Sequence, residues 1–191
     1  GYYNTFGSNN MYFGTNAGHK NRQGHYNIMY GTEAGYSFIL NHYNIFLGFE
    51  TGKGDSSHSY YSAIYIPGGL DGDILFKGDA NLGIGFKSLH KVTIGYYNIC
   101  LGIKSGFKIS TGHNNTFLGN LSGYNNTIGN YNIAVGQDSL RYNTTGINNT
   151  AIGYETLKNN TTASYNTAVG YHALACNTTG QYNVALGFHA L

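Results

Sequence analysis

The chain has 191 residues, including 29 Gly and 19 Tyr, and only 9% of its residues are charged. Its net charge of +2 comes without any run of Lys or Arg, which argues against nucleic acid as a partner. No apolar stretch approaches the ~20 residues that a bilayer-spanning helix needs, which argues against membrane insertion. Aromatic residues make up 15% of the chain, so there is apolar surface to bury and little charge repulsion to keep the chain open. An ordered, β-rich protein is predicted.

A 17-residue repeat runs through the whole sequence and makes residues 1–191 a single domain. Each copy contains an Asn-x-x-x-Gly unit, and we call its last residue the anchor glycine. The first residue of the unit is Asn in ten of eleven copies, and Ile64 is the exception. The anchors recur at a 17-residue interval everywhere except between Gly48 and Gly68, where the interval is longer by three. The anchors are Gly14, Gly31, Gly48, Gly68, Gly85, Gly102, Gly119, Gly136, Gly153, Gly170 and Gly187.

Each copy contains one short segment with the character of a β-strand. Residues 131–136 (Tyr-Asn-Ile-Ala-Val-Gly) and 165–170 (Tyr-Asn-Thr-Ala-Val-Gly) are rich in β-branched residues and are bounded by turn residues. The period is too short for helix-pair repeats, which need about 33 residues or more. We therefore predict an all-β fold, a parallel β-solenoid (β-roll) of eleven 17-residue coils, which would form a rod about 50 Å long at the ~4.8 Å spacing of strands.

Two neighbouring columns of the repeat are apolar. The residue just before the anchor, such as Val135, is apolar in every copy, and we expect this column to face a continuous core. The column at the phase of Ala134 is also largely apolar and must point to the opposite side of the strand. A second apolar face needs a partner, so self-association as a homotrimer is expected. Four residues after the anchor, Gly gives way to Leu in C-terminal copies such as Leu157, which predicts a fuller core there.

The longer interval adds three residues within 53–60, and insertions in solenoids often form functional loops on one face. The candidate ligand-contacting residues are Lys53, Asp55, Ser56, His58 and Tyr60, with a tolerated bulge as the alternative. Three carboxylates lie close together in the sequence: Asp71, Asp73 and Asp79. They could bind calcium, and the alternative is that they are polar turn residues. Two histidine pairs, each one period apart, are predicted to form structural ladders rather than metal sites: His25 with His42, and His172 with His189.

The sequence carries no catalytic grouping of Ser, His and Asp and no phosphate-loop spacing. We therefore expect neither enzyme activity nor a cofactor or metal. Cys100 and Cys176 lie at different phases and more than four coils apart, which puts them beyond the reach of a disulfide. Asn-x-Ser/Thr sequons cluster between Asn114 and Asn177, where Asn and Thr also suit tight turns and ladders.

The most regular copies lie near the C-terminus. Residues 166–174 (Asn-Thr-Ala-Val-Gly-Tyr-His-Ala-Leu) and 177–187 (Asn-Thr-Thr-Gly-Gln-Tyr-Asn-Val-Ala-Leu-Gly) resemble repeats of bacteriophage and giant-virus tail-fibre-like proteins. In rhythm the chain is also similar to the YadA-like head of trimeric autotransporter adhesins, whose repeats form a left-handed parallel β-roll. The resemblance is closest over residues 114–191 and implies a homotrimeric fibre with a binding or spacer role. The 17-residue period and the columns rich in Tyr and Asn differ from those heads.

Together these observations predict a structural protein that forms the shaft or head of an extracellular fibre, on a virion or a cell. We expect it to adhere to a host-surface glycan or protein through many weak contacts, which avidity would strengthen. Because neither end has a polar capping repeat, we expect a segment of a longer fibre. The alternatives are a self-assembling filament with a mechanical role and an ice-binding solenoid with rows of Thr.

Overall fold

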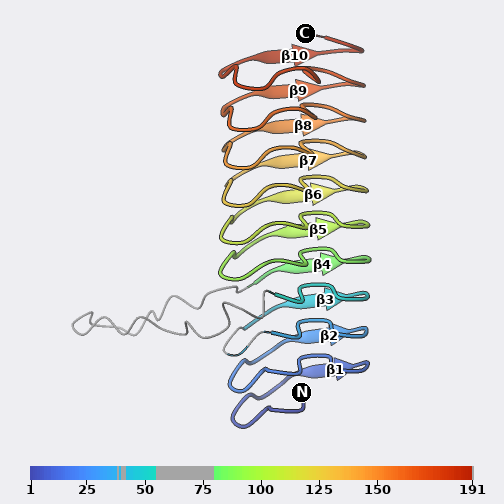
Figure 1. Cartoon of the computed structure of the whole chain (residues 1–191), viewed down its shortest axis with the longest axis vertical. Coiled ribbons are helices and arrows are strands. Elements are labelled where there is room, and N and C mark those ends of the chain that lie inside the picture. The colour runs from blue at the N-terminus through green and yellow to red at the C-terminus, as the bar shows by residue number, and fades with distance from the viewer. Residues whose placement is uncertain (38, 40–41, 55–79, 191) are drawn as a thin grey trace, which may run out of the picture.

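The computed structural model describes residues 1–37, 39, 42–54 and 80–190, which wind into a stack of coils (Figure 1). In this part of the chain each coil contributes one three-residue strand to a single parallel sheet, and the strands follow one another in chain order. The strands are β1 (Met11–Phe13), β2 (Ile28–Tyr30), β3 (Ile45–Leu47), β4 (Leu82–Ile84), β5 (Ile99–Leu101), β6 (Thr116–Leu118), β7 (Ile133–Val135), β8 (Thr150–Ile152), β9 (Thr167–Val169) and β10 (Val184–Leu186). The prediction of an all-β parallel solenoid is confirmed.

The stack continues without a break across the long interval in the repeat. β3 pairs directly with β4, and Ile45 lies opposite Leu82, a sequence separation of 37 against 17 for the other strand partners. The coil predicted around Gly68 therefore does not lie between β3 and β4, so the described sheet has ten strands rather than eleven. The insertion into the stack is twenty residues (37 minus 17) rather than three. The sequence offers a reason, because Ile64 replaces the recurrent Asn and Pro67 has no N–H for a sheet.

The side of each strand that faces the core is the opposite of the one that the sequence predicted. The middle residue of each strand points into the coil, and Phe46, Phe117 and Ala134 are fully buried. The flanking column that we expected to face the core, which includes Ile84 and Ile152, points outward. Because both columns are apolar, alternation of hydrophobicity could not decide between them. The recurrent Asn decides, since it is buried and shares the side of the strand occupied by the residue two positions later.

A ladder of asparagine side chains runs through the interior of the stack. The backbone N–H and the Nδ2 of Asn132 donate to Oδ1 of Asn115 in the preceding coil at 3.0 and 3.2 Å, and Nδ2 also donates to the carbonyl of Gly146 at 2.8 Å. Asn149 donates to Oδ1 of Asn132 in the same way. Each interior amide thereby finds partners above and below, which removes the penalty for burying it. The ladder comprises Asn10, Asn27, Asn44, Asn81, Asn98, Asn115, Asn132, Asn149, Asn166 and Asn183.

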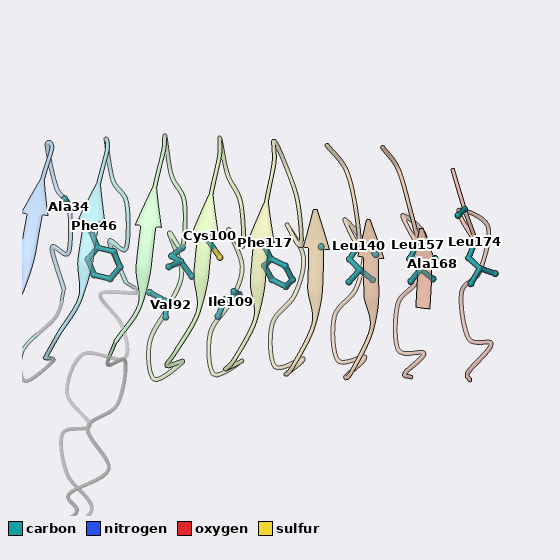
Figure 2. Close-up of a cluster of buried hydrophobic side chains, with 14 of the residues drawn as sticks. Ala34, Phe46, Val92, Cys100, Ile109, Phe117, Leu140, Leu157, Ala168 and Leu174 are labelled. Carbon is teal, nitrogen blue, oxygen red and sulfur yellow. The ribbon is translucent and has the colours of Figure 1, made fainter. Parts of the chain in front are cut away.

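Two positions in each coil share the task of filling the apolar core (Figure 2). Where the middle strand residue is bulky, as at Phe117, the residue six positions later is Gly, and a Cβ on Gly123 would lie 2.4 Å from the Phe117 ring. Where the strand residue is small, as at Ala134, the later residue is a buried Leu such as Leu140. The expected fuller C-terminal core is therefore not found, because Leu replaces a bulky strand residue instead of adding to it. The pairs that follow this rule are Tyr12/Gly18, Met29/Gly35, Phe46/Gly52, Gly83/Leu89, Phe117/Gly123, Ala134/Leu140, Ala151/Leu157 and Ala168/Leu174. At Cys100/Gly106 both residues are small, and the buried side chain of Ile109 fills the space beside them.

The anchor glycines permit the coils to stack at the turn after each strand. Gly136 has φ 130°, a conformation that L-residues rarely adopt, and a Cβ there would lie 2.3 Å from the carbonyl oxygen of Gly153 in the next coil. A second glycine recurs seven residues before the anchor in most copies of the repeat. At Gly146 glycine is required for close approach alone, because a Cβ there would lie 2.3 Å from the carbonyl oxygen of Ala163. Both glycines are required because adjacent coils lie too close together for a side chain at these two positions.

Candidate functional surfaces

One long side of the stack is apolar and uncharged. We call it the strand face, and it consists of the four outward columns that lie five, three and one residues before the anchor and one residue after it. In the coil of β7 these residues are Tyr131, Ile133, Val135 and Gln137. Over ten coils the four columns make forty positions, and none holds Asp, Glu, Lys, Arg or His. They also hold 23 of the 28 exposed large hydrophobic residues of the described chain.

Aromatic rings stack between coils along the strand face. Three such pairs have nearly parallel rings with centroids 4.7 to 5.2 Å apart: Phe13 with Tyr30, Tyr26 with Tyr43, and Tyr165 with Tyr182. Tyr154 and Tyr171 form a further stack with centroids 5.2 Å apart. Because each ring rests on the ring of the next coil, these exposed side chains lose less freedom when they contact a partner.

Charged side chains lie on the other sides of the coils and gather beside the insertion. Glu50 contacts Nζ of Lys87 at 3.2 Å, Nζ of Lys53 at 3.5 Å and Nε2 of His90 at 3.1 Å, and Lys53 also pairs with Glu33. Partial burial opposes ionisation of Glu50, but its hydrogen bond to Lys87 and the charge of Lys53 bring its pKa below the usual range. Burial lowers the pKa of His90 to about 4 against the attraction of Glu50. At neutral pH His90 is therefore a neutral hydrogen-bond partner of Glu50.

The predicted ligand-contacting loop is only partly within the described structure. Lys53 lies in the ion-pair cluster and bridges the carboxylates of Glu33 and Glu50. The other predicted loop residues, Asp55, Ser56, His58 and Tyr60, lie outside the described residues. So do the three candidate calcium ligands, Asp71, Asp73 and Asp79. Within the described ranges, no three His, Cys, Asp or Glu side chains come together as a metal site would require.

The histidine pairs stack as the repeat predicts. The rings of His25 and His42 are 5.1 Å apart and those of His172 and His189 are 4.9 Å apart. The backbone N–H of His25 donates to Nδ1 of His42 at 2.9 Å, which requires that nitrogen to be unprotonated. Burial lowers the pKa of His42 and thereby favours the neutral ring. These contacts are those of a structural ladder.

A basic depression of about 510 Å³ lies over the coils of β4 to β6. Lys91 and Lys108, one coil apart, line it together with Phe107. Among the described residues, no carboxylate pairs with either lysine. Four hydroxyl-bearing residues complete the lining: Thr93, Ser110, Thr111 and Thr127. Sequence analysis did not identify this site, although two lysines one period apart, Lys91 and Lys108, were a visible signal.

The cysteines agree with the prediction, since Cys100 is buried, Cys176 is exposed and both are free thiols.

In the described part of the chain, no helix is long and apolar enough to cross a membrane. Comparisons with protein-family models, with curated proteins and with solved structures returned no match to this chain. Any functional conclusion must therefore come from the surfaces described above.

Proposed function

We propose that this chain is a structural segment of an extracellular fibre, carried by a virion or a cell, and that it works as a homotrimer. The observation that most directly supports a fibre segment is the uninterrupted asparagine ladder from Asn10 to Asn183. Among the described strands, each one contacts only the next strand above or below it in the stack, so every added repeat lengthens the stack without changing its cross-section. Such a chain is suited to holding one end of a fibre at a distance from the other. The similarity of the repeats to fibre and adhesin-head repeats points the same way.

The proposal is tested by measuring the mass of the purified chain in solution by light scattering and by imaging it by electron microscopy. We expect a mass of three chains and stiff rods whose stacked coils span about 43 Å, given nine spacings of ~4.8 Å. End-to-end polymers would instead favour the self-assembling filament. A stable monomer would contradict the homotrimer.

We propose in addition that the fibre is adhesive and that the basic depression binds an acidic sugar. The uncompensated charges of Lys91 and Lys108 suit a carboxylate or sulfate group, and the ring of Phe107 suits the apolar face of a sugar. Three of the surrounding hydroxyl groups, those of Thr93, Ser110 and Thr127, donate to backbone carbonyls of the next coil and can still accept a hydrogen bond from a sugar hydroxyl. A single site of this kind is weak, but copies on a multichain fibre would act together.

The adhesive proposal is tested with immobilised carboxylated and sulfated oligosaccharides, using neutral oligosaccharides as the comparison. We expect the double variant Lys91→Glu/Lys108→Glu to lose at least tenfold in binding. The matched pair is Lys108→Glu and Lys104→Glu, because the two variants make the same charge change in the same coil, but Lys104 lies outside the depression. Equal losses in both variants would indicate a general charge effect and would contradict a specific site.

A further inference from the structure

We infer that the strand face is the surface through which copies of this chain pack together around a three-fold axis. This inference rests on the proposed homotrimer and specifies its interface. The partner at this face is the same face of two further copies. Three features of the described structure support it: the missing charges, the size of the face and its width.

The missing charges are not a requirement of the coil. Charged residues make up 18 of 191 positions, so forty positions would hold about four at the average frequency, whereas the strand face holds none. The next column, two residues after the anchor, starts the same turn and carries Glu33, Glu50, Lys87 and Lys104. The coil therefore accommodates charge one residue beyond the edge of the face. A face that meets its own copies must avoid charge, because identical residues would repel one another across the interface.

The area of the face matches what a stable interface needs. Thirteen aromatic side chains of the face are on average about half exposed, and at about 150 to 250 Å² for each aromatic residue they present about 1,000 to 1,700 Å² of accessible surface. A specific interface of standard size buries about 800 Å² per partner, whereas the largest apolar patch on a typical monomer is about 300 to 600 Å². The strand face is thus larger than a solitary chain would expose.

The width of the strand sheet suits packing around an axis that runs along the stack. In each coil only the three strand residues form a flat surface, because Tyr131 before the strand and Gly136 after it have positive φ angles of 57° and 130°. The flat strip is therefore narrow, and Ile133 and Val135 project from it toward solvent. Such strips of three chains can meet around one axis. Because the coils stack in register, equivalent residues of the three chains would meet at the same level.

The test compares two isoleucines of similar exposure. Ile133 lies on the strand face and is 42% exposed, and Ile128 lies off the face in the preceding coil and is 49% exposed. We expect wild type and Ile128→Glu to have a three-chain mass in light scattering, and Ile133→Glu to have a one-chain mass with an unchanged circular dichroism spectrum. The substitution would place three carboxylates around the axis.

A second measurement covers the case in which Ile133→Glu does not fold alone. In a Cys176→Ser background, Ile133→Cys is expected to form disulfides between chains on mild oxidation, whereas Ile128→Cys is not. If Ile133→Glu keeps the three-chain mass, the strand face is not the interface, although the trimeric fibre stands. A monomeric wild type would overturn both proposals. A two-chain mass that Ile133→Glu abolishes would keep the face and overturn the three-fold packing.

Discussion

Core filling by paired positions predicts that a destabilising substitution can be rescued within its own coil. Phe117→Ala removes a fully buried ring, and substitutions of this kind cost about 3 to 5 kcal/mol. Gly123→Leu alone should also be severely destabilising, because its Cβ would lie 2.4 Å from that ring. Together the two changes reproduce the natural pair Ala134 and Leu140. The new Leu regains about 1.5 to 3 kcal/mol by burial and loses about 1 to 2 kcal/mol by adopting φ near 57°, so the double variant should be more stable than either single variant.

The assay is urea denaturation of the wild type, the two single variants and the double variant, which forms a double-mutant cycle. We expect a coupling free energy of at least about 2 kcal/mol in favour of the double variant, because the ring that blocks the new Leu is absent from it. The natural pair at Ala134 provides the control, since Leu140→Gly should destabilise and Ala134→Phe/Leu140→Gly should recover. Simple addition of the single effects would refute the idea that the two positions share one space.

Three further predictions concern the interior of the stack. Asn132→Asp should destabilise the fold by about 3 to 5 kcal/mol, because a buried carboxylate would face hydrogen-bond acceptors. The control Asn130→Asp keeps the acceptor role of that side chain and should change stability by less than about 0.5 kcal/mol. Equal urea midpoints for the two variants would contradict the ladder. The pKa of His90 is about 4 in the folded chain and 6.5 when unperturbed, so the unfolded state binds the proton first and stability should fall as the pH drops from 6.5 to 4, by up to about 3 kcal/mol before solvent screening reduces it. His90→Gln should flatten that pH profile of the unfolding free energy, and an unchanged profile would assign the loss to other groups. A thiol reagent should modify only Cys176 in the folded chain, because burial raises the pKa of Cys100 and shields it, and two reactive thiols under native conditions would contradict this burial.

Much of the fold could be predicted because one period repeats along the chain. A constant 17-residue interval permits neighbouring strands to pair in register, and this is the register observed between β7 and β8. The same period predicted the stacking of His25 on His42 and the separation of the two cysteines. These features depend only on translation from one coil to the next, so no knowledge of side-chain direction was needed.

Side-chain direction and coil number could not be predicted in the same way. Val135 and Ala134 are both apolar, so hydrophobicity could not tell the inside of the coil from the outside. The stronger cue was the polar Asn132, whose amide can be buried only because identical amides lie above and below it. The Leu column, which includes Leu140, was expected to enlarge the core because the small Ala134 column that offsets it was assigned to the opposite side of the strand. The interval at Gly68 imitates one period and so conceals a longer insertion.

The buried columns of the repeat determine the stability of the coil, whereas the exposed columns are free to serve association between chains. Gln137 and Asp138 are consecutive residues of one turn, yet only the second column carries charge along the chain. If the strand face is an interface, Gln137→Lys should weaken association while the stability of the coil changes by less than about 0.5 kcal/mol. Sedimentation at several protein concentrations and urea denaturation would measure the two effects separately. Association as tight as that of the wild type would place this column outside the contact, and the interface would then be narrower than the face.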